Sequence, residues 1–172
     1  PRGRVADWTR AIKARFGFLL MTLFLAMAPD LDVFHGLLSG HLNAFHQGLT
    51  HTAGWCLLFA SGMYACWHAF HPEDGWRCWL FFSAVALSHL LVDFMTEDGR
   101  LPYGIMAFWP LSNQCFISGL SMFLGPEKAT FRALFQWHNA KVMLVDALWC
   151  LPLLLAVLAW KWTGWNSWRR PK

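Results

Sequence analysis

Four long runs of apolar residues constrain the fold of this 172-residue chain more than any other feature of its sequence. The strongest run covers residues 142–163, and the others cover residues 16–28, 52–70 and 78–96. A helix needs about 20 apolar residues to cross the roughly 30 Å hydrocarbon core of a bilayer. Only the run at 16–28, a helix of about 20 Å, falls well short of that length, so it either spans with help from its flanks or enters the membrane partway and stops. We therefore predict an all-α, integral-membrane helical bundle with about four transmembrane helices.

The composition agrees with a membrane protein. Apolar residues make up 56% of the chain and charged residues 14%, about half the usual charged share. The 12 Trp and 15 Phe suit the interface between membrane and water. We expect one domain with a basic interfacial segment at 1–15 and a basic tail at 161–172, both contacting lipid headgroups and not nucleic acid. An even number of crossings would place both basic termini on the same side of the membrane. Basic residues favour the cytoplasmic side, so both termini are expected there.

Two further segments differ from the apolar runs. Residues 105–124 are apolar but contain Trp109-Pro110 and a polar stretch at 112–114, so we predict a re-entrant or interfacial segment there. Residues 125–141 carry several charges and are expected to form a surface helix. The five Cys include no CxxC pair, which disfavours a thiolate metal site.

The apolar run at 78–96 contains two polar residues that need a partner. His89 and Asp93 are four residues apart in SHLLVD, so they share one helix face. An Asp in the middle of a transmembrane helix costs roughly 2.5–3.5 kcal/mol on insertion scales. A bound cation would offset this cost, and so would a His–Asp hydrogen bond between helices.

Two other pairs of potential ligands lie in the segment at 29–51. Asp30 and Asp32 follow Pro29 in PDLD, where an extended backbone would place both on one side. They could equally be helix-end charges. His46 and His51 are five apart in HQGLTH, where Gly48 permits a bend that could aim both at one point. An ordinary polar loop is the alternative for that pair.

Together these side chains predict a metal centre at a membrane surface. The predicted ligands are Asp30, Asp32, His46, His51, His89 and Asp93. Oxygen and imidazole ligands without thiolate suit one or two Zn, Mn or Fe ions. Two such ions about 3.5–4 Å apart favour phosphoester hydrolysis by activated water, with catalytic roles for Asp32, His51 and Asp93. Four further residues are expected to contact substrate or to support the ligands: Gln47, Thr50, His35 and Trp109.

The order of these motifs resembles a known family. PDLD, HQGLTH and SHLLVD, followed by GIMAFWPLS, match the pattern PDxD, HRGxTH, SHxxxD and G…WP over residues 29–112. This pattern is typical of the bacterial membrane-bound metal-dependent hydrolases, also described as LexA-binding, inner-membrane-associated hydrolases of the YdjM type. The resemblance implies an integral protein of the bacterial inner membrane, a divalent metal and hydrolase activity.

The chain departs from the family pattern at two places. Gln47 stands where the pattern has Arg, and Gln cannot bind an anionic group as bidentately as Arg does. Residues 1–15 contain no His, whereas the family begins with a His-containing segment, so a ligand upstream is left open.

The function expected is a membrane-embedded metal-dependent hydrolase acting on an amphiphilic or lipid phosphoester. The alternative is a non-catalytic membrane protein that binds metal, handles ions or acts as a partner-binding scaffold.

Overall fold

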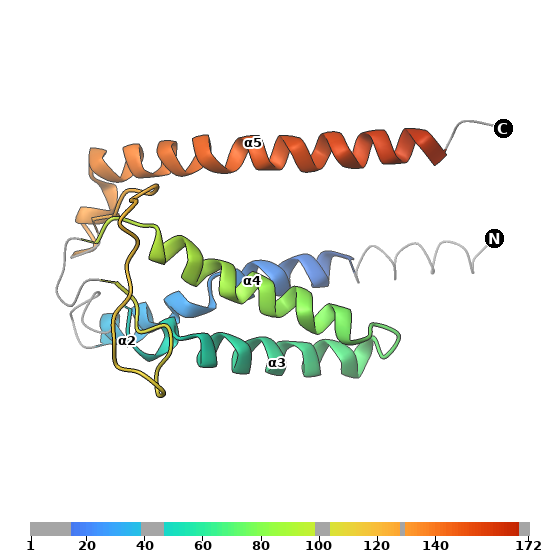
Figure 1. Cartoon of the computed structure of the whole chain (residues 1–172), viewed down its shortest axis with the longest axis horizontal. Coiled ribbons are helices and arrows are strands. Elements are labelled where there is room, and N and C mark those ends of the chain that lie inside the picture. The colour runs from blue at the N-terminus through green and yellow to red at the C-terminus, as the bar shows by residue number, and fades with distance from the viewer. Residues whose placement is uncertain (1–14, 39–46, 99–103, 128–129, 169–172) are drawn as a thin grey trace.

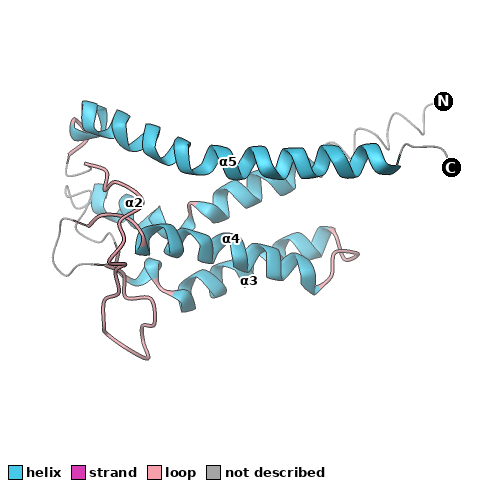
Figure 2. Cartoon of the chain, turned by 45° about the horizontal axis from the view of Figure 1, so that its top comes forward, coloured by secondary structure: helices cyan, strands magenta, loops and turns pink. Residues whose placement is uncertain are grey.

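The computed structural model describes residues 15–38, 47–98, 104–127 and 130–168 (Figure 1). Every regular element in these ranges is helical, as predicted (Figure 2). The elements are the helix Arg15–Ala26, η1 (Ala28–Leu31), α2 (Asp32–Leu38), η2 (Leu49–His51), α3 (Ala53–Phe70), α4 (Trp76–Phe94), η3 (Ala133–Phe135) and α5 (Trp137–Trp168).

A sharp bend separates the first helix from α2. The helix Arg15–Ala26 and the segment Ala28–Leu38 meet at 67°. Pro29 lies in the first turn of η1, where its missing N–H and fixed φ are tolerated. The N–H of Asp30 donates to the carbonyl of Met27 at 3.1 Å. The extended geometry expected for Asp30 and Asp32 is therefore wrong, because Pro29 starts a new helical turn here.

Helices α3 and α4 form an antiparallel hairpin (Figure 1). Thr52 caps α3 by accepting a hydrogen bond from the N–H of Trp55 at 3.1 Å. In the turn at 71–75, Asp74 accepts a hydrogen bond from Trp67 Nε1 at 2.7 Å. The helix Arg15–Ala26 packs on this hairpin. The core that the three helices share includes Leu25, Cys56, Ala60, Phe82, Ala86 and Leu90.

An irregular segment at 104–127 closes over the C-terminal end of α4. Its residues Ile105 and Phe116 exchange two backbone hydrogen bonds of 2.9 and 3.0 Å. Phe123 accepts a hydrogen bond from Glu97 N–H at 2.9 Å, just beyond α4. This segment contains no helix in its described residues. A single surface helix over 125–141 is also wrong, because the described residues of this range form η3 at Ala133–Phe135 and then the start of α5 at Trp137.

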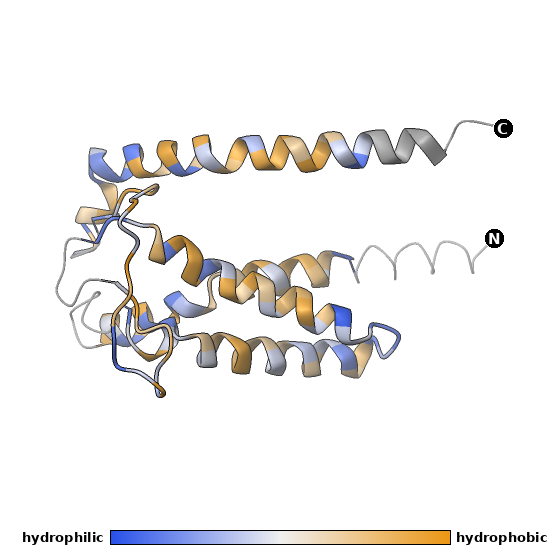
Figure 3. Ribbon diagram, viewed as in Figure 1, coloured by the Kyte–Doolittle hydropathy of each residue, from blue (hydrophilic) through white to orange (hydrophobic). Residues whose placement is uncertain are grey.

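The structure offers two or three candidate membrane spans. Helix α4 and the segment Trp137–Trp162 of α5 are long and apolar enough to cross a membrane, and the bent pair at 15–38 would make a third span. A count of about four is not confirmed, because α3 falls below this apolarity although it has 18 residues. Its Trp, Tyr, Ser and His side chains reduce its hydropathy. Within the most apolar 18-residue stretch of Trp137–Trp162, only 6% of the residues are buried inside the molecule. The helix is largely apolar along this stretch (Figure 3).

Loops and short helices gather at one end of the molecule. The turn at 71–75 and the C-terminal part of α5 lie at one end, while α2, η2 and η3 lie at the other (Figures 1 and 2). The candidate site lies toward this second end.

Candidate metal centre

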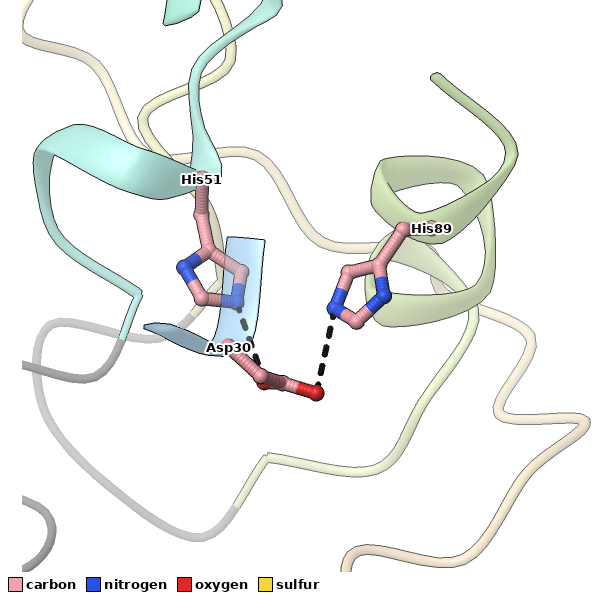
Figure 4. Close-up of side chains that lie close together, drawn as sticks. All are labelled: Asp30, His51 and His89. Atoms are coloured by element: carbon pink, nitrogen blue, oxygen red, sulfur yellow. Dashed lines mark ion pairs between the residues drawn. The ribbon is translucent and has the colours of Figure 1, made fainter. Parts of the chain in front are cut away.

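Three elements that are far apart in the sequence bring together Asp30, His51 and His89. Asp30 comes from η1, His51 ends η2, and His89 lies in the last two turns of α4. One ligand atom from each lies within 4.8 Å of the other two. Figure 4 shows the carboxylate of Asp30 between the two imidazole rings. We call these three residues the candidate metal-binding triad, or the triad.

Asp93 lies beside the triad, one helical turn beyond His89. Its Oδ2 is 3.3 Å from His51 Nε2 and 3.4 Å from His89 Nε2. The carboxylate of Asp30 is 3.6 Å from His51 Nε2 and 3.7 Å from His89 Nε2. Both imidazoles therefore present Nε2 to two carboxylates.

The two separations between the Asp30 carboxylate and the imidazole nitrogens are longer than direct hydrogen bonds and suit a shared cation. Hydrogen bonds between nitrogen and oxygen are about 2.7–3.2 Å long. Two ligand atoms each about 2.0–2.2 Å from a tetrahedral cation lie about 3.4 Å apart. The Asp30 separations of 3.6 and 3.7 Å are close to this second value. The buried Nε2 of His89 forms no hydrogen bond with a described residue, so its lone pair can serve as a ligand.

The bend after Ala26 orients His89. In a continuous helix the Ala26 carbonyl would accept from the N–H of Asp30, but that N–H donates to Met27 instead. The Ala26 carbonyl lies 2.8 Å from Nδ1 of His89. A proton on Nδ1 would leave Nε2 as the metal-binding nitrogen. Sequence reasoning missed this carbonyl, although Pro29, which disrupts helical hydrogen bonding, was a signal for it.

His51 is oriented by polar groups on its other side. Its Nδ1 lies 3.3 Å from Asp32 Oδ2 and 3.2 Å from Thr50 Oγ1. Thr50 Oγ1 also donates to Asp32 Oδ2 at 3.1 Å. Asp32 thus contacts the imidazole nitrogen opposite the triad, as carboxylates behind metal-bound His residues do.

The electrostatics of His51 are unusual. Its side chain is fully buried, and burial alone would lower its pKa. Interactions with Asp30 and Asp32 and the charge of Asp93 outweigh burial and raise its pKa to about 9. A divalent cation would replace the proton among these carboxylates.

One side of the triad is open. The side chain of Asp30 is 39% exposed, compared with 16% for His89 and 0% for His51. A small molecule could therefore approach from the side of Asp30, while the helices cover the imidazoles.

The structure does not join all the predicted site residues. His46 lies outside the described residues. Gln47 has a left-handed φ of 65° just before η2, and His35 is on the exposed face of α2. Trp109 lies in the irregular segment, next to Gly54 at the start of α3. The roles of these residues stay predictions. The metal-ligand roles of Asp30, Asp32, His51, His89 and Asp93 and the catalytic roles of Asp32, His51 and Asp93 stay predictions as well.

The fold and the site define a helical membrane protein with a candidate divalent-metal centre. The chain belongs to the YdjM inner membrane protein family, whose model matches residues 4–166. The resemblance inferred from the sequence motifs is thereby confirmed. The chain is similar to the inner membrane protein YbcI of Escherichia coli (strain K12), with 28% identity over 149 residues that cover 83% of each chain. No solved structure matches the chain.

Proposed function

We propose that this protein is a membrane-embedded, metal-dependent hydrolase of an amphiphilic phosphoester. The observation that carries the proposal is the candidate metal-binding triad, in which one ligand atom each from Asp30, His51 and His89 lies within 4.8 Å of the other two, with the Asp30 side chain 39% exposed. Catalytic zinc sites typically have three protein ligands and one position left for water or substrate. A divalent cation bound there would polarise a phosphoryl oxygen and acidify a water molecule.

Six residues of the chain would bind the cation, move the proton or orient a ligand. Asp30, His51 and His89 would hold the cation. Asp93 Oδ2, within 3.4 Å of both Nε2 atoms, is placed to accept a proton from the attacking water. The water oxygen would bond to phosphorus as the ester P–O bond breaks, and Asp93 would then pass its proton to the departing alkoxide. Asp32 and Thr50 would hold the ring of His51 in place.

The charge distribution supports an orientation in which the site opens on the non-cytoplasmic face. Of the described basic residues, Arg15, Arg77 and Lys161 belong to segments that reach the end opposite the triad, while Arg132 and Lys141 belong to η3's flank and the start of α5 at the triad end (Figure 1). Basic residues near the ends of membrane spans favour the cytoplasmic side. Both termini would then lie on the cytoplasmic side of the bacterial inner membrane.

Metal analysis and a hydrolysis assay together test the proposal. Purified wild-type protein loaded with Zn, Mn or Fe(II) is expected to retain stoichiometric metal, and His89→Ala to lose it. Asp93→Asn should keep metal but lose about 10²-fold or more in hydrolysis of phosphatidic acid. His71→Ala, in the turn at the far end of α3, is the matched control.

Two results would contradict the proposal. Wild-type protein that holds no stoichiometric metal after loading would exclude the metal centre. Wild-type protein that holds metal but cleaves no phosphoester would favour a non-catalytic metal-binding protein.

A further inference from the structure

One face of the first helix is apolar and exposed, and it extends along the helix axis toward the triad. Its residues at helical spacing are 50–65% exposed. They are Phe16, Leu19, Leu20, Leu23 and Met27, which we call the apolar stripe. The opposite face carries Phe18, Met21 and Leu25, which pack in the core. The stripe is thus the side of this helix that is left for lipid.

The stripe ends at the open side of the candidate metal centre. Met27 is the residue before η1, and Asp30 lies three residues later in that 3₁₀ turn. Residues i and i+3 of a 3₁₀ helix lie on the same face. Asp30 is also the most exposed residue of the triad. An apolar chain lying on the stripe would therefore bring its polar end to Asp30.

Helix α2 continues the apolar surface beyond this point. It leaves the first helix at 67°, and its seven residues make it too short to cross a membrane. Its Asp32 and Gly36 are buried, while Phe34, Leu37 and Leu38 are 59–88% exposed. A short helix with one apolar face suits the boundary between headgroups and acyl chains.

The length and composition of the stripe favour an acyl chain over a second copy of this chain. The rise from Phe16 to Met27 is about 16 Å, close to half of the roughly 30 Å hydrocarbon core. Helices that pair in membranes usually bring small residues together. The stripe instead consists of Phe, Leu and Met. Flexible lipid chains pack against such large side chains without needing a close approach of two backbones.

We propose that the substrate is a long-chain phospholipid whose acyl chain lies along the apolar stripe and whose phosphoester reaches Asp30. This inference rests on the proposed function, because it names the substrate class of the same centre. It requires the chain length of the substrate to matter, and it requires the stripe to contact lipid more specifically than the other exposed helices do.

The test compares two double variants with matched exposure. Leu20→Ala/Leu23→Ala alters the stripe, where the two Leu are 50% and 53% exposed. Leu155→Ala/Leu158→Ala alters α5, where they are 55% and 52% exposed. Each protein is placed in nanodiscs with phosphatidic acid that carries a photoreactive diazirine on its acyl chain, and labelled residues are mapped by mass spectrometry. Hydrolysis of dipalmitoyl and dihexanoyl phosphatidic acid is measured in parallel.

The expected result is preferential labelling of the stripe over the exposed face of α5. The stripe variant should lose roughly tenfold in kcat/KM on the long-chain lipid and little on the short-chain lipid, as expected for lost methylene contacts. The α5 variant should lose neither.

Equal labelling of both helices, an equal loss in both variants, or crosslinks between two copies through the stripe would overturn the inference. Stripe labelling without hydrolysis would contradict the proposed function and leave the lipid site standing. Hydrolysis that is independent of acyl-chain length would overturn the acyl-chain site and leave the proposed hydrolase function standing.

Discussion

At the scale of single residues, the two imidazoles of the triad contact different groups through Nδ1, the nitrogen that faces away from Asp30. His89 faces the neutral carbonyl of Ala26, whereas His51 faces the carboxylate of Asp32 and the hydroxyl of Thr50. A carboxylate behind a metal-bound imidazole raises its basicity and fixes its orientation. His51 is therefore expected to be the stronger of the two nitrogen ligands.

Replacing Thr50 with Val should weaken metal binding without unfolding the protein. Val has nearly the same shape but lacks the hydroxyl that lies 3.1 Å from Asp32 Oδ2 and 3.2 Å from His51 Nδ1. Loss of such a supporting group typically reduces metal affinity about 10–100-fold. A competition titration with a fluorescent chelator measures the change. Thr22→Val, which removes a hydroxyl bonded only within its own helix, is the control, and equal affinities for the two variants would contradict the expectation.

Metal affinity should rise with pH up to about 9. Without metal, His51 has a pKa of about 9, so it is protonated at neutral pH and must lose a proton to bind a cation. Below that pKa the affinity should fall about tenfold per pH unit for each proton displaced. Calorimetry at pH 7.5 in buffers of different ionisation enthalpy counts the protons released, and a count near zero would refute this role of His51.

The same pKa sets the stability of the metal-free protein. The pKa of His51 is raised above its ordinary value of 6.5 in the folded state. Its protonated form therefore stabilises the fold fully below pH 6.5, and this contribution is lost as the pH rises through about 9. Metal should reverse this trend, because a bound cation takes the place of the proton.

At the scale of elements, the long helices could be predicted and the contacts of the irregular segments could not. The apolar run at 78–96 became α4 at Trp76–Phe94, because its periodicity and length are local properties. The pairing of Ile105 with Phe116 joins residues eleven apart, which propensity alone does not reveal. The start of α5 likewise depends on Asn139, whose side chain bonds to the backbone of Glu127.

Gly104→Ala should destabilise the segment that covers the end of α4. Gly104 has a φ of 88°, and a Cβ there would lie 2.2 Å from the Phe116 carbonyl oxygen. An incompatible Gly→Ala change costs more than about 1 kcal/mol. Thermal unfolding in detergent should show a lower Tm than for Gly62→Ala, whose added Cβ meets open space. An unchanged Tm would show that this segment does not contribute to the stability of the hairpin.

At the scale of the whole molecule, the sequence could predict which segments meet but not how their atoms meet. The order of apolar runs places 29–51 and the end of α4 at the same depth, and the structure brings Asp30, His51 and His89 together there. Sequence spacing could not show that Asp30 and Asp32 approach opposite nitrogens of His51. That arrangement depends on the 67° bend, which is a tertiary feature.

The proposed orientation can be checked with fusion reporters. Green fluorescent protein fused after Glu73, in the turn at 71–75, should fluoresce because this turn is expected in the cytoplasm. Alkaline phosphatase fused after Leu111, which is 92% exposed in the irregular segment, should be active because that segment is expected outside. The reciprocal fusions serve as controls, and the opposite pattern of signals would invert the topology.

The bend at Met27 has a consequence for how the protein matures. At this bend the Ala26 carbonyl contacts Nδ1 of His89 in α4. The next turn places the carboxylate of Asp30 near Nε2 of the same imidazole. Neither half of the centre is complete until the first helix has docked on the hairpin. If the triad binds a cation as proposed, complete binding would therefore require this docking, and metal loading would be coupled to the assembly of the three helices.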